Sequence, residues 1–566
     1  MLDLVIRNVD VVDGTGSPRR RADVGVRDGR IESIGAIDEA AMREIDATGL
    51  TIAPGFIDLH THYDAQVLWD RRLKPSPLHG VTTVIAGNCG YSLGPVKPQD
   101  REWLLSLLAR VEGVPMAALR TGVDITWESF GDYLKVVEGP IGINIAFYVG
   151  HSPIRRAVMG PSATTDKATP EQIEAMCALL DESLAAGGVG FATAIQKSHV
   201  DGDGHPTPPQ AADYDEIRAL AAVCGRHEGT WMQITPTQAP MTAEQGALLA
   251  DMSIMSNRPV SYLLVRAPGD TVVAIEAERA GGRLWGQLFL TAGIPIRLSF
   301  GDGLLLRNLP DPWSRVLDLT RQERIEAFLD PAVRAELRDA LERDRATDTR
   351  HEGAERWERF VVNDCGVDSM AKFVGRRVSD IAAERHLDAF DMALVLAAEA
   401  QLDIAFCADQ SDGGDDRALQ AKLLGEDHVV IGASDAGAHI DSFVGADFGT
   451  RLLAELVRHD ALMTLEAAIH CLTEIPATSC GLLDRGVLRS GAWADMVLFD
   501  PTEIAATRMH PMTDWPGGAM HLTTEAVGIH RVFVAGEEVV VDGEYTDKLP
   551  GRLLRSGVDT VTVAAH

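Results

Sequence analysis

The stretch Ile52-Ala53-Pro54-Gly55-Phe56-Ile57-Asp58-Leu59-His60-Thr61-His62 is an apolar run that ends in two histidines separated by one residue. On a β-strand alternate residues point to the same face, so the imidazoles of His60 and His62 can meet one cation. At the carboxyl end of a strand in a parallel barrel they would lie on the face that carries catalytic residues. Two histidines at this spacing also occur on unrelated strands, so the rest of the chain has to support this interpretation.

Short apolar runs alternate with helical stretches along most of the remaining chain, which is typical of βα units around a parallel sheet. One helix is marked by Thr169, Pro170 and Gln172, which fit a helix start with a capping box. Eight strands are the number in a TIM-like (β/α)8 barrel, and this is the α/β fold that we predict. The predicted strands are 52–59, 81–87, 143–149, 188–194, 229–234, 259–265, 293–299 and 428–433.

The two ends of the chain share a different pattern, in which apolar and polar residues alternate between turn dipeptides. We therefore expect residues 1–53 and 481–545 to form one small β-sandwich domain, with the barrel at 54–480. Residues 301–425 are too many for one βα connection and contain charged helical sequence, so we predict an inserted helical subdomain after the seventh strand. It could be a surface decoration or a lid. Residues 546–566 are expected to form a C-terminal tail.

The composition narrows the classes of partner. The chain has 566 residues, with 52 Lys and Arg against 83 Asp and Glu and a formal charge of -31. This charge repels nucleic acid and anionic lipid, so we expect neither partner. The seven cysteines form no CxxC pair, which indicates reduced thiols in a cytoplasmic protein. No uncharged run approaches the ~18 residues of a membrane span.

Five motifs along the chain together resemble the amidohydrolase superfamily. Pro54-Gly55-Phe56-Ile57-Asp58-Leu59-His60-Thr61-His62 and the distant Ile431-Gly432-Ala433-Ser434-Asp435 carry the superfamily resemblance. Gly87-Asn88-Cys89-Gly90, Gly150-His151 and Ala494-Asp495-Met496-Val497 narrow it to the N-acyl-D-amino-acid deacylase branch. The resemblance covers nearly the whole chain and implies a metal-dependent hydrolase.

Four residues are the expected metal ligands: His60, His62, Cys89 and Asp435. In the branch the residue at Cys89 binds the metal, and a thiolate suits zinc, although a lone cysteine can also be a small buried apolar side chain. Asp435 follows the eighth strand, which lies beside the first in a closed barrel. It could take a proton from a water that the cation acidifies and deliver it to the leaving nitrogen, or it could merely cap a turn.

Further candidates follow other strands. His151 is a candidate catalytic residue that could bind a substrate carbonyl or hold the attacking water, or it could be structural. Arg155 could bind an acidic group of the substrate or form an ion pair. Lys197, close to His199, and His439 are weaker candidates for substrate binding.

The chain also departs from the branch, in which the fifth and sixth strands each end in a metal-binding histidine. By our alignment Trp231 and Tyr262 stand at these positions, bordering the substrate, and Leu264 replaces a lysine that holds the substrate carboxylate. We therefore predict one divalent cation, with zinc as the default and iron or manganese as alternatives. A carboxylated lysine as an extra ligand is disfavoured because Lys197 lies in a predicted loop.

Three functions remain open at this point. The first is hydrolysis of a linear or cyclic amide, such as an N-acyl amino acid, by a metal-activated water. The second keeps the barrel and metal but makes the protein a lyase, a lactonase or a C–C hydrolase. The third is a binding protein without catalysis. A small-molecule substrate is expected in the first two, and the superfamily resemblance makes a homo-oligomer reasonable.

Overall fold

The computed structural model describes residues 1–237, 241–290, 296–301, 311–347, 354–409, 414–432 and 434–564. Two parallel sheets form its centre, with strand orders β6-β7-β8 and β9-β10-β11-β12-β13-β17. Every pair of neighbouring strands within these two sheets is parallel. The strands are β6 (Phe56–Asp58), β7 (Val81–Ala86), β8 (Asn144–Phe147), β9 (Val149–Gly150), β10 (Gly190–Ala194), β11 (Trp231–Thr235), β12 (Val260–Leu263), β13 (Leu284–Leu288) and β17 (Val429–Ile431).

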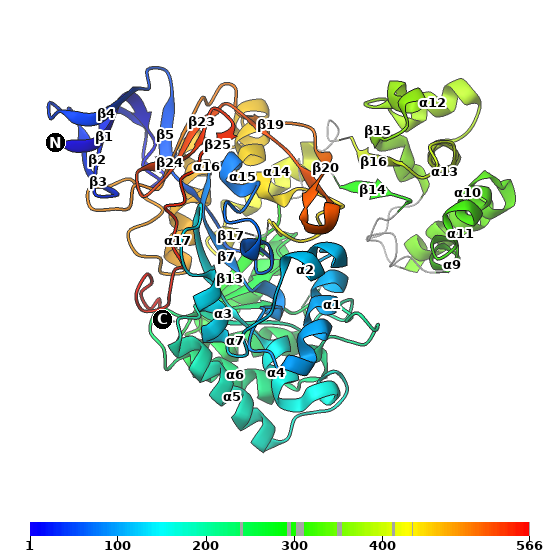
Figure 1. Cartoon of the computed structure of the whole chain (residues 1–566), viewed down its shortest axis with the longest axis horizontal. Helices are drawn as coiled ribbons and strands as arrows, with labels where there is room; N and C mark the ends of the chain where they lie inside the picture. The colour runs from blue at the N-terminus through cyan, green and yellow to red at the C-terminus, as the bar shows by residue number, and fades with distance from the viewer. Residues whose placement is uncertain are drawn as a thin grey trace.

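Helices connect these strands and cover their outer side (Figure 1). The predicted helix start is confirmed, because the Thr169 hydroxyl accepts a bond from Gln172 N and the Gln172 side chain accepts one from Thr169 N. Buried leucine, isoleucine and methionine side chains of the helices pack against the sheets in one large core. These helices are α4 (His151–Met159), α5 (Pro170–Ala185), α6 (Tyr214–Cys224), α7 (Ala243–Ser256) and α8 (Val272–Arg279).

Hydrogen bonds just beyond β6 and β17 join the first and the last of these strands. Asp435 N donates to His60 O at 3.1 Å and His62 N donates to Ala436 O at 2.7 Å. Thr61 pairs in parallel with Ala436. Residues some 370 positions apart are thereby held side by side at the carboxyl ends of the strands.

The predicted seventh strand at 293–299 is wrong. The strand between β12 and β17 is β13 (Leu284–Leu288), whereas β14 (Arg297–Ser299) pairs antiparallel with β16 (Ile404–Ala408) in another sheet. Both segments are short and apolar, and β13 carries a buried Gln287 that interrupts its apolar pattern. Residues 293–295, and Ala433 of the predicted eighth strand, lie outside the described residues.

The insertion after β13 has its own core and stands to one side of the parallel sheets (Figure 1). It is not purely helical, because the sheet β14-β16-β15 runs through it, with β15 at Phe360–Cys365. Aromatic rings of Phe300, Trp357 and Phe406 meet in its centre. Its helices are α9 (Trp313–Leu317), α10 (Arg321–Leu329), α11 (Pro331–Thr347), α12 (Val378–Arg385) and α13 (Ala389–Glu399).

Both chain ends contribute to one sheet, whose main path is β25-β24-β23-β18-β5-β1-β2-β3, with β4 against β1. Within this sheet the antiparallel pair of β5 with β18 joins the two ends. The N-terminal strands are β1 (Leu2–Val11), β2 (Arg20–Arg27), β3 (Arg30–Gly35), β4 (Ala41–Asp46) and β5 (Thr51–Pro54). The C-terminal strands are β18 (Met496–Phe499), β23 (Ile529–Val534), β24 (Glu537–Val541) and β25 (Glu544–Tyr545).

The C-terminal segment, through residue 564, is not a free tail. Gly551 N donates to Ile141 O at 2.7 Å, and Leu554 N donates to Ile145 O at 2.8 Å. The Leu554 side chain is fully buried, so the segment contributes to the core next to β8. Among the described residues, no helix combines the length and the apolar character needed to cross a membrane.

Candidate metal centre

His60 and His62 lie just past the end of β6 with both side chains buried. Their ring centroids are 5.3 Å apart. Cys89 follows β7 in a left-handed backbone conformation with φ of 54°. Its Sγ lies 3.4 Å from His60 Nε2. The three potential ligand atoms all lie within 4.8 Å of one another, and two imidazoles with a thiolate suit a borderline-soft cation such as zinc.

Asp435 completes this group from the loop after β17. Its Oδ1 lies 3.3 Å from His60 Nε2 and 3.5 Å from His62 Nε2. Burial raises the pKa of Asp435, but the hydrogen bond from His62 and the charges of both imidazoles outweigh burial and hold this pKa below its usual range. The structure therefore brings together all four residues expected at the metal, and their ligand roles stay a prediction.

Gln287 of β13 fixes the orientation of His60. Its Oε1 lies 2.8 Å from His60 Nδ1, and its Nε2 donates to Ser261 Oγ at 3.0 Å. As an acceptor, Oε1 keeps a hydrogen on Nδ1, so Nε2 is the ring nitrogen that faces Cys89 and Asp435 and is available to a cation. On the other side of the group, Cys89 N donates to the side-chain Oε1 of Gln233 at 2.9 Å.

Asp58 joins the strands beneath this group. Ser434 Oγ donates to Asp58 Oδ2 at 2.5 Å, and His60 N donates to Asp58 Oδ1 at 3.3 Å. Burial raises the pKa of Asp58 to about 7. The carboxyl group thus links the loop that carries Asp435 to the strand that carries the histidines.

Glu112 is a neighbour of the metal centre that the sequence analysis missed. It directly follows α1 (Arg101–Val111), and its buried Oε2 lies 3.5 Å from His62 Nε2. Burial raises the pKa of Glu112, and the nearby His62 and His439 oppose this shift only in part. The local sequence Val111-Glu112-Gly113-Val114 contains no motif that indicates a site.

His151 and Arg155 lie in a buried network, which agrees with the structural alternative for His151 and the ion-pair alternative for Arg155. His151 Nδ1 lies 2.9 Å from Thr193 Oγ1 and its Nε2 lies 2.8 Å from Glu216 Oε1. Arg155 Nε donates to the same Glu216 oxygen at 2.9 Å, and its two other nitrogens donate to backbone carbonyls. Both side chains are fully buried, so this network ties α4 to α6 and leaves Arg155 without a free donor face for a substrate acid.

Trp231 and Tyr262 also differ from the expected positions at the strand ends. Trp231 begins β11, and its Nε1 donates to the hydroxyl of Tyr148 inside a buried cluster. The Tyr262 hydroxyl donates to Asp270 O at 2.9 Å, on the side of β12 that packs against the helices. At the end of β11, Thr235 Oγ1 lies 3.4 Å from Cys89 Sγ, and β12 ends at Leu263.

The weaker candidates lie in two different settings. Lys197 is exposed in the loop after β10. His439 N donates to Glu112 O at 2.5 Å. His439 Nδ1 is buried and has no hydrogen-bond partner among the described residues. His199 Nδ1 lies 2.7 Å from the Tyr91 hydroxyl, and burial, with the nearby His439, lowers the pKa of His199 to about 4. His439 therefore borders the centre, and Lys197 does not contact it.

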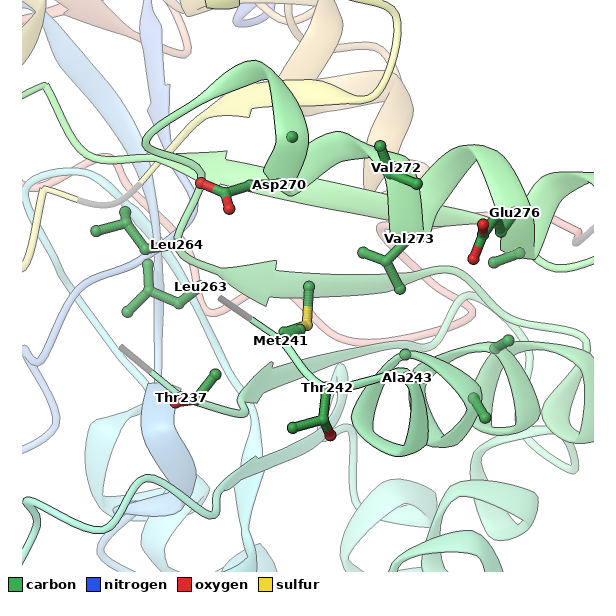
Figure 2. Close-up of a pocket in the computed structure, with 15 residues that line it drawn as sticks. Thr237, Met241, Thr242, Ala243, Leu263, Leu264, Asp270, Val272, Val273 and Glu276 are labelled. Carbon is green, nitrogen blue, oxygen red and sulfur yellow. The ribbon is translucent and has the colours of Figure 1, made fainter. Parts of the chain in front are cut away.

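A cavity of about 370 Å³ opens beyond the ends of β11 and β12, between α7 and α8 (Figure 2). Leu263, Leu264 and Met241 line its inner part, and Asp270 and Glu276 supply carboxylates. No lysine or arginine stands among the described lining residues. The described lining is therefore mainly apolar and includes two carboxylates.

Comparison with known proteins gives consistent matches over the whole length. The sequence model of the amidohydrolase family matches residues 43–263 and 320–546. The D-aminoacylase of Alcaligenes xylosoxydans xylosoxydans is 30% identical over 561 residues, covering 98% of this chain and 97% of that protein. The N-acyl-D-aspartate deacylase of the same organism is 31% identical over 561 residues, covering 98% and 95%.

Solved structures of such deacylases superpose on this fold. D-aminoacylase, described with a binuclear metal centre, one-metal activation and second-metal attenuation, gives a TM-score of 0.64 at 27% identity, covering 98% of this chain and 100% of that one. N-acyl-D-glutamate deacylase from Bordetella bronchiseptica, in complex with zinc and a phosphonate inhibitor, gives 0.60 at 25% identity with the same coverage. The resemblance drawn from the sequence is thus confirmed: the chain belongs to the amidohydrolase family and is a hydrolase acting on carbon–nitrogen bonds other than peptide bonds.

Proposed function

We propose that the protein is a single-metal amidohydrolase that cleaves an N-acyl amino acid or a related linear or cyclic amide. In this proposal the parallel strands form one closed (β/α)8 barrel over residues 54–480, and residues 1–53 with 481–545 form a β-sandwich. The observation that carries the proposal is the convergence of His60, His62, Cys89 and Asp435 at one end of the parallel strands. A carboxyl-end location is where barrel enzymes hold their catalytic residues.

One cation, with zinc as the first choice, fits the donors better than two. His60, His62 and Cys89 supply a compact set, whereas Thr235 and Leu263 at the neighbouring strand ends supply no imidazole. The description of D-aminoacylase in terms of one-metal activation supports this assignment by analogy. A divalent cation bound there would polarise an amide carbonyl and acidify a water molecule.

Asp435 is the group proposed to move the proton. Its Oδ1 lies 3.3 Å from His60 Nε2 and 3.5 Å from His62 Nε2, so this carboxylate would stand beside a cation held by the two histidines and could accept a proton from a water that the cation acidifies. The side chain is 21% exposed, so this acceptor can be reached from the solvent-facing side of the site. The same oxygen can then deliver the proton to the leaving nitrogen. His60 is held in the required tautomer by Gln287 during both steps.

The cavity beyond β11 and β12 is proposed to accept a neutral, apolar part of the substrate. An acidic side group would meet Asp270 and Glu276 without a basic partner among the described lining residues. Burying such a charge beside like charges is costly. The expected substrate therefore has no acidic side chain, unlike the substrates named for the N-acyl-D-aspartate and N-acyl-D-glutamate deacylases. A cytoplasmic location is proposed as well, since all seven cysteines are free thiols.

The test combines metal analysis with a panel of N-acyl-D- and N-acyl-L-amino acids that carry apolar, acidic or basic side chains. We expect about one zinc ion per chain and a preference for apolar substrates. His60→Ala and Asp435→Asn should each abolish turnover. Turnover that survives both substitutions would refute the proposal, and cleavage of esters or carbon–carbon bonds with no amide hydrolysed would favour a lactonase, lyase or C–C hydrolase instead.

A further inference from the structure

Glu112 lies beside the metal centre although it comes from a part of the chain without any metal-binding motif. Its side chain is 4% exposed, and its Oε2 lies 3.5 Å from Nε2 of His62. An ionised carboxylate that is buried costs free energy unless a cation or hydrogen bonds compensate it. Within the described ranges no lysine or arginine forms an ion pair with this carboxylate, and His62 is the group that faces it.

The backbone holds Glu112 firmly at this place. Glu112 N donates to Leu108 O at 2.9 Å, which ends α1, and Glu112 O accepts a bond from His439 N at 2.5 Å. His439 belongs to the same loop as Asp435. The segment after α1 is therefore attached to the loop that supplies the proton-accepting carboxylate, and the carboxylates of Glu112 and Asp435 both lie 3.5 Å from His62 Nε2.

The spacing of the donor atoms is the spacing of ligands around one small cation. Donors about 2.1 Å from a tetrahedral zinc ion lie about 3.4 Å from one another. The distance is 3.4 Å from Cys89 Sγ to His60 Nε2 and 3.5 Å from His62 Nε2 to Glu112 Oε2. A carboxylate oxygen of Glu112 thus lies at the spacing of a ligand from His62 Nε2, next to the compact group of His60, His62 and Cys89.

We propose that Glu112 is a metal ligand, so that His60, His62, Cys89 and Glu112 hold the cation. This inference rests on the proposed single-metal function. Glu112 would supply, from the end of α1, a ligand that Thr235 and Leu263 at the neighbouring strand ends do not supply. It also separates two roles: Glu112 keeps the charge of the cation compensated while Asp435 takes up and releases a proton.

The first test measures cobalt binding to the metal-free full-length protein. Glu112→Gln is expected to weaken Co²⁺ affinity at least about 100-fold, beyond the about 10–100-fold typical of residues that only orient a ligand. Its visible d–d bands should shift, while the thiolate-to-cobalt charge-transfer band from Cys89 remains. Glu102→Gln is the matched control, because Glu102 is an exposed residue of the same helix, and it should leave affinity and spectrum unchanged.

A second measurement needs no variant. In a crystal structure of the zinc-loaded wild-type protein, anomalous scattering should place zinc about 2.1 Å from a Glu112 oxygen. A distance beyond about 3 Å, or wild-type cobalt affinity and spectrum in Glu112→Gln, overturns the assignment of Glu112. If His60→Ala abolishes cobalt binding at the same time, the proposed function stands without Glu112. A wild-type protein that binds no cobalt or zinc refutes both.

Discussion

Replacing Gln287 with leucine tests whether the metal centre depends on the tautomer of His60. Gln287 is fully buried, and its Oε1 lies 2.8 Å from His60 Nδ1. Without this acceptor, metal-free His60 can move its proton to Nε2 and bond to Cys89 or Asp435 instead. Binding a cation at Nε2 then forces a buried N–H at Nδ1 that has no partner.

The cost of that unpaired group is about 1–3 kcal/mol, and it falls on metal binding rather than on folding. It corresponds to a loss of about 5- to 150-fold in affinity, in line with the about 10–100-fold effect of other residues that orient metal-binding histidines. The assay is competition of the protein with a chromophoric chelator for Zn²⁺, at pH 7.5 or another fixed pH. The control is Ser261→Ala, which removes only the second partner of Gln287 and should change affinity less than about threefold. Wild-type zinc affinity in Gln287→Leu would show that the tautomer is fixed by something else.

Three further predictions concern residues around the centre. Glu216→Gln should lower the free energy of unfolding by about 3–5 kcal/mol in urea titrations, because it leaves the charge of the buried Arg155 uncompensated. Its zinc affinity should stay at the wild-type value. A change in the free energy of unfolding below about 1 kcal/mol would contradict this. His199 has a folded-state pKa of about 4 against about 6.5 unfolded, so its neutral form stabilises the fold above pH 6.5 and this contribution is lost as pH falls toward 4. The melting temperature of the metal-free wild type should therefore fall more steeply over that window than that of His199→Gln, and parallel curves would speak against it. Tyr262→Phe should cost about 1 kcal/mol of stability and leave KM unchanged, because its hydroxyl bonds to the backbone on the helix side; a raised KM would return Tyr262 to the substrate site.

Most residues of the candidate metal centre could be predicted from local sequence patterns. His60 and His62 stand two residues apart after an apolar run, and Cys89 and Asp435 each follow a predicted strand. These are short-range patterns, and the carboxyl ends of parallel strands meet at one face whatever the details of packing. The four side chains accordingly converge in the structure. The helix start at Thr169 was readable for the same reason, since a capping box is a contact between residues three apart.

Two features were decided only by the tertiary structure: which side chains of a strand point inward, and which strands pair with each other. The side chains of a strand alternate with a period of two, so a small error in register reverses which residues point inward, and this is how Tyr262 was assigned to the wrong side of β12. The seventh strand had two neighbouring apolar candidates, and the choice of β13 depends on its pairing with β12 and β17.

The sequence by itself predicted His60, His62, Cys89 and Asp435 as the ligands of a cation, because each of them stands in a motif at a strand end. Only the fold decided which other residues contact these four. Gln287 reaches His60 across 227 positions, and Glu112 reaches His62 from a helix end that is tied to the loop of His439. Such contacts join segments that have no local pattern in common, so they exist only once the chain has closed around them.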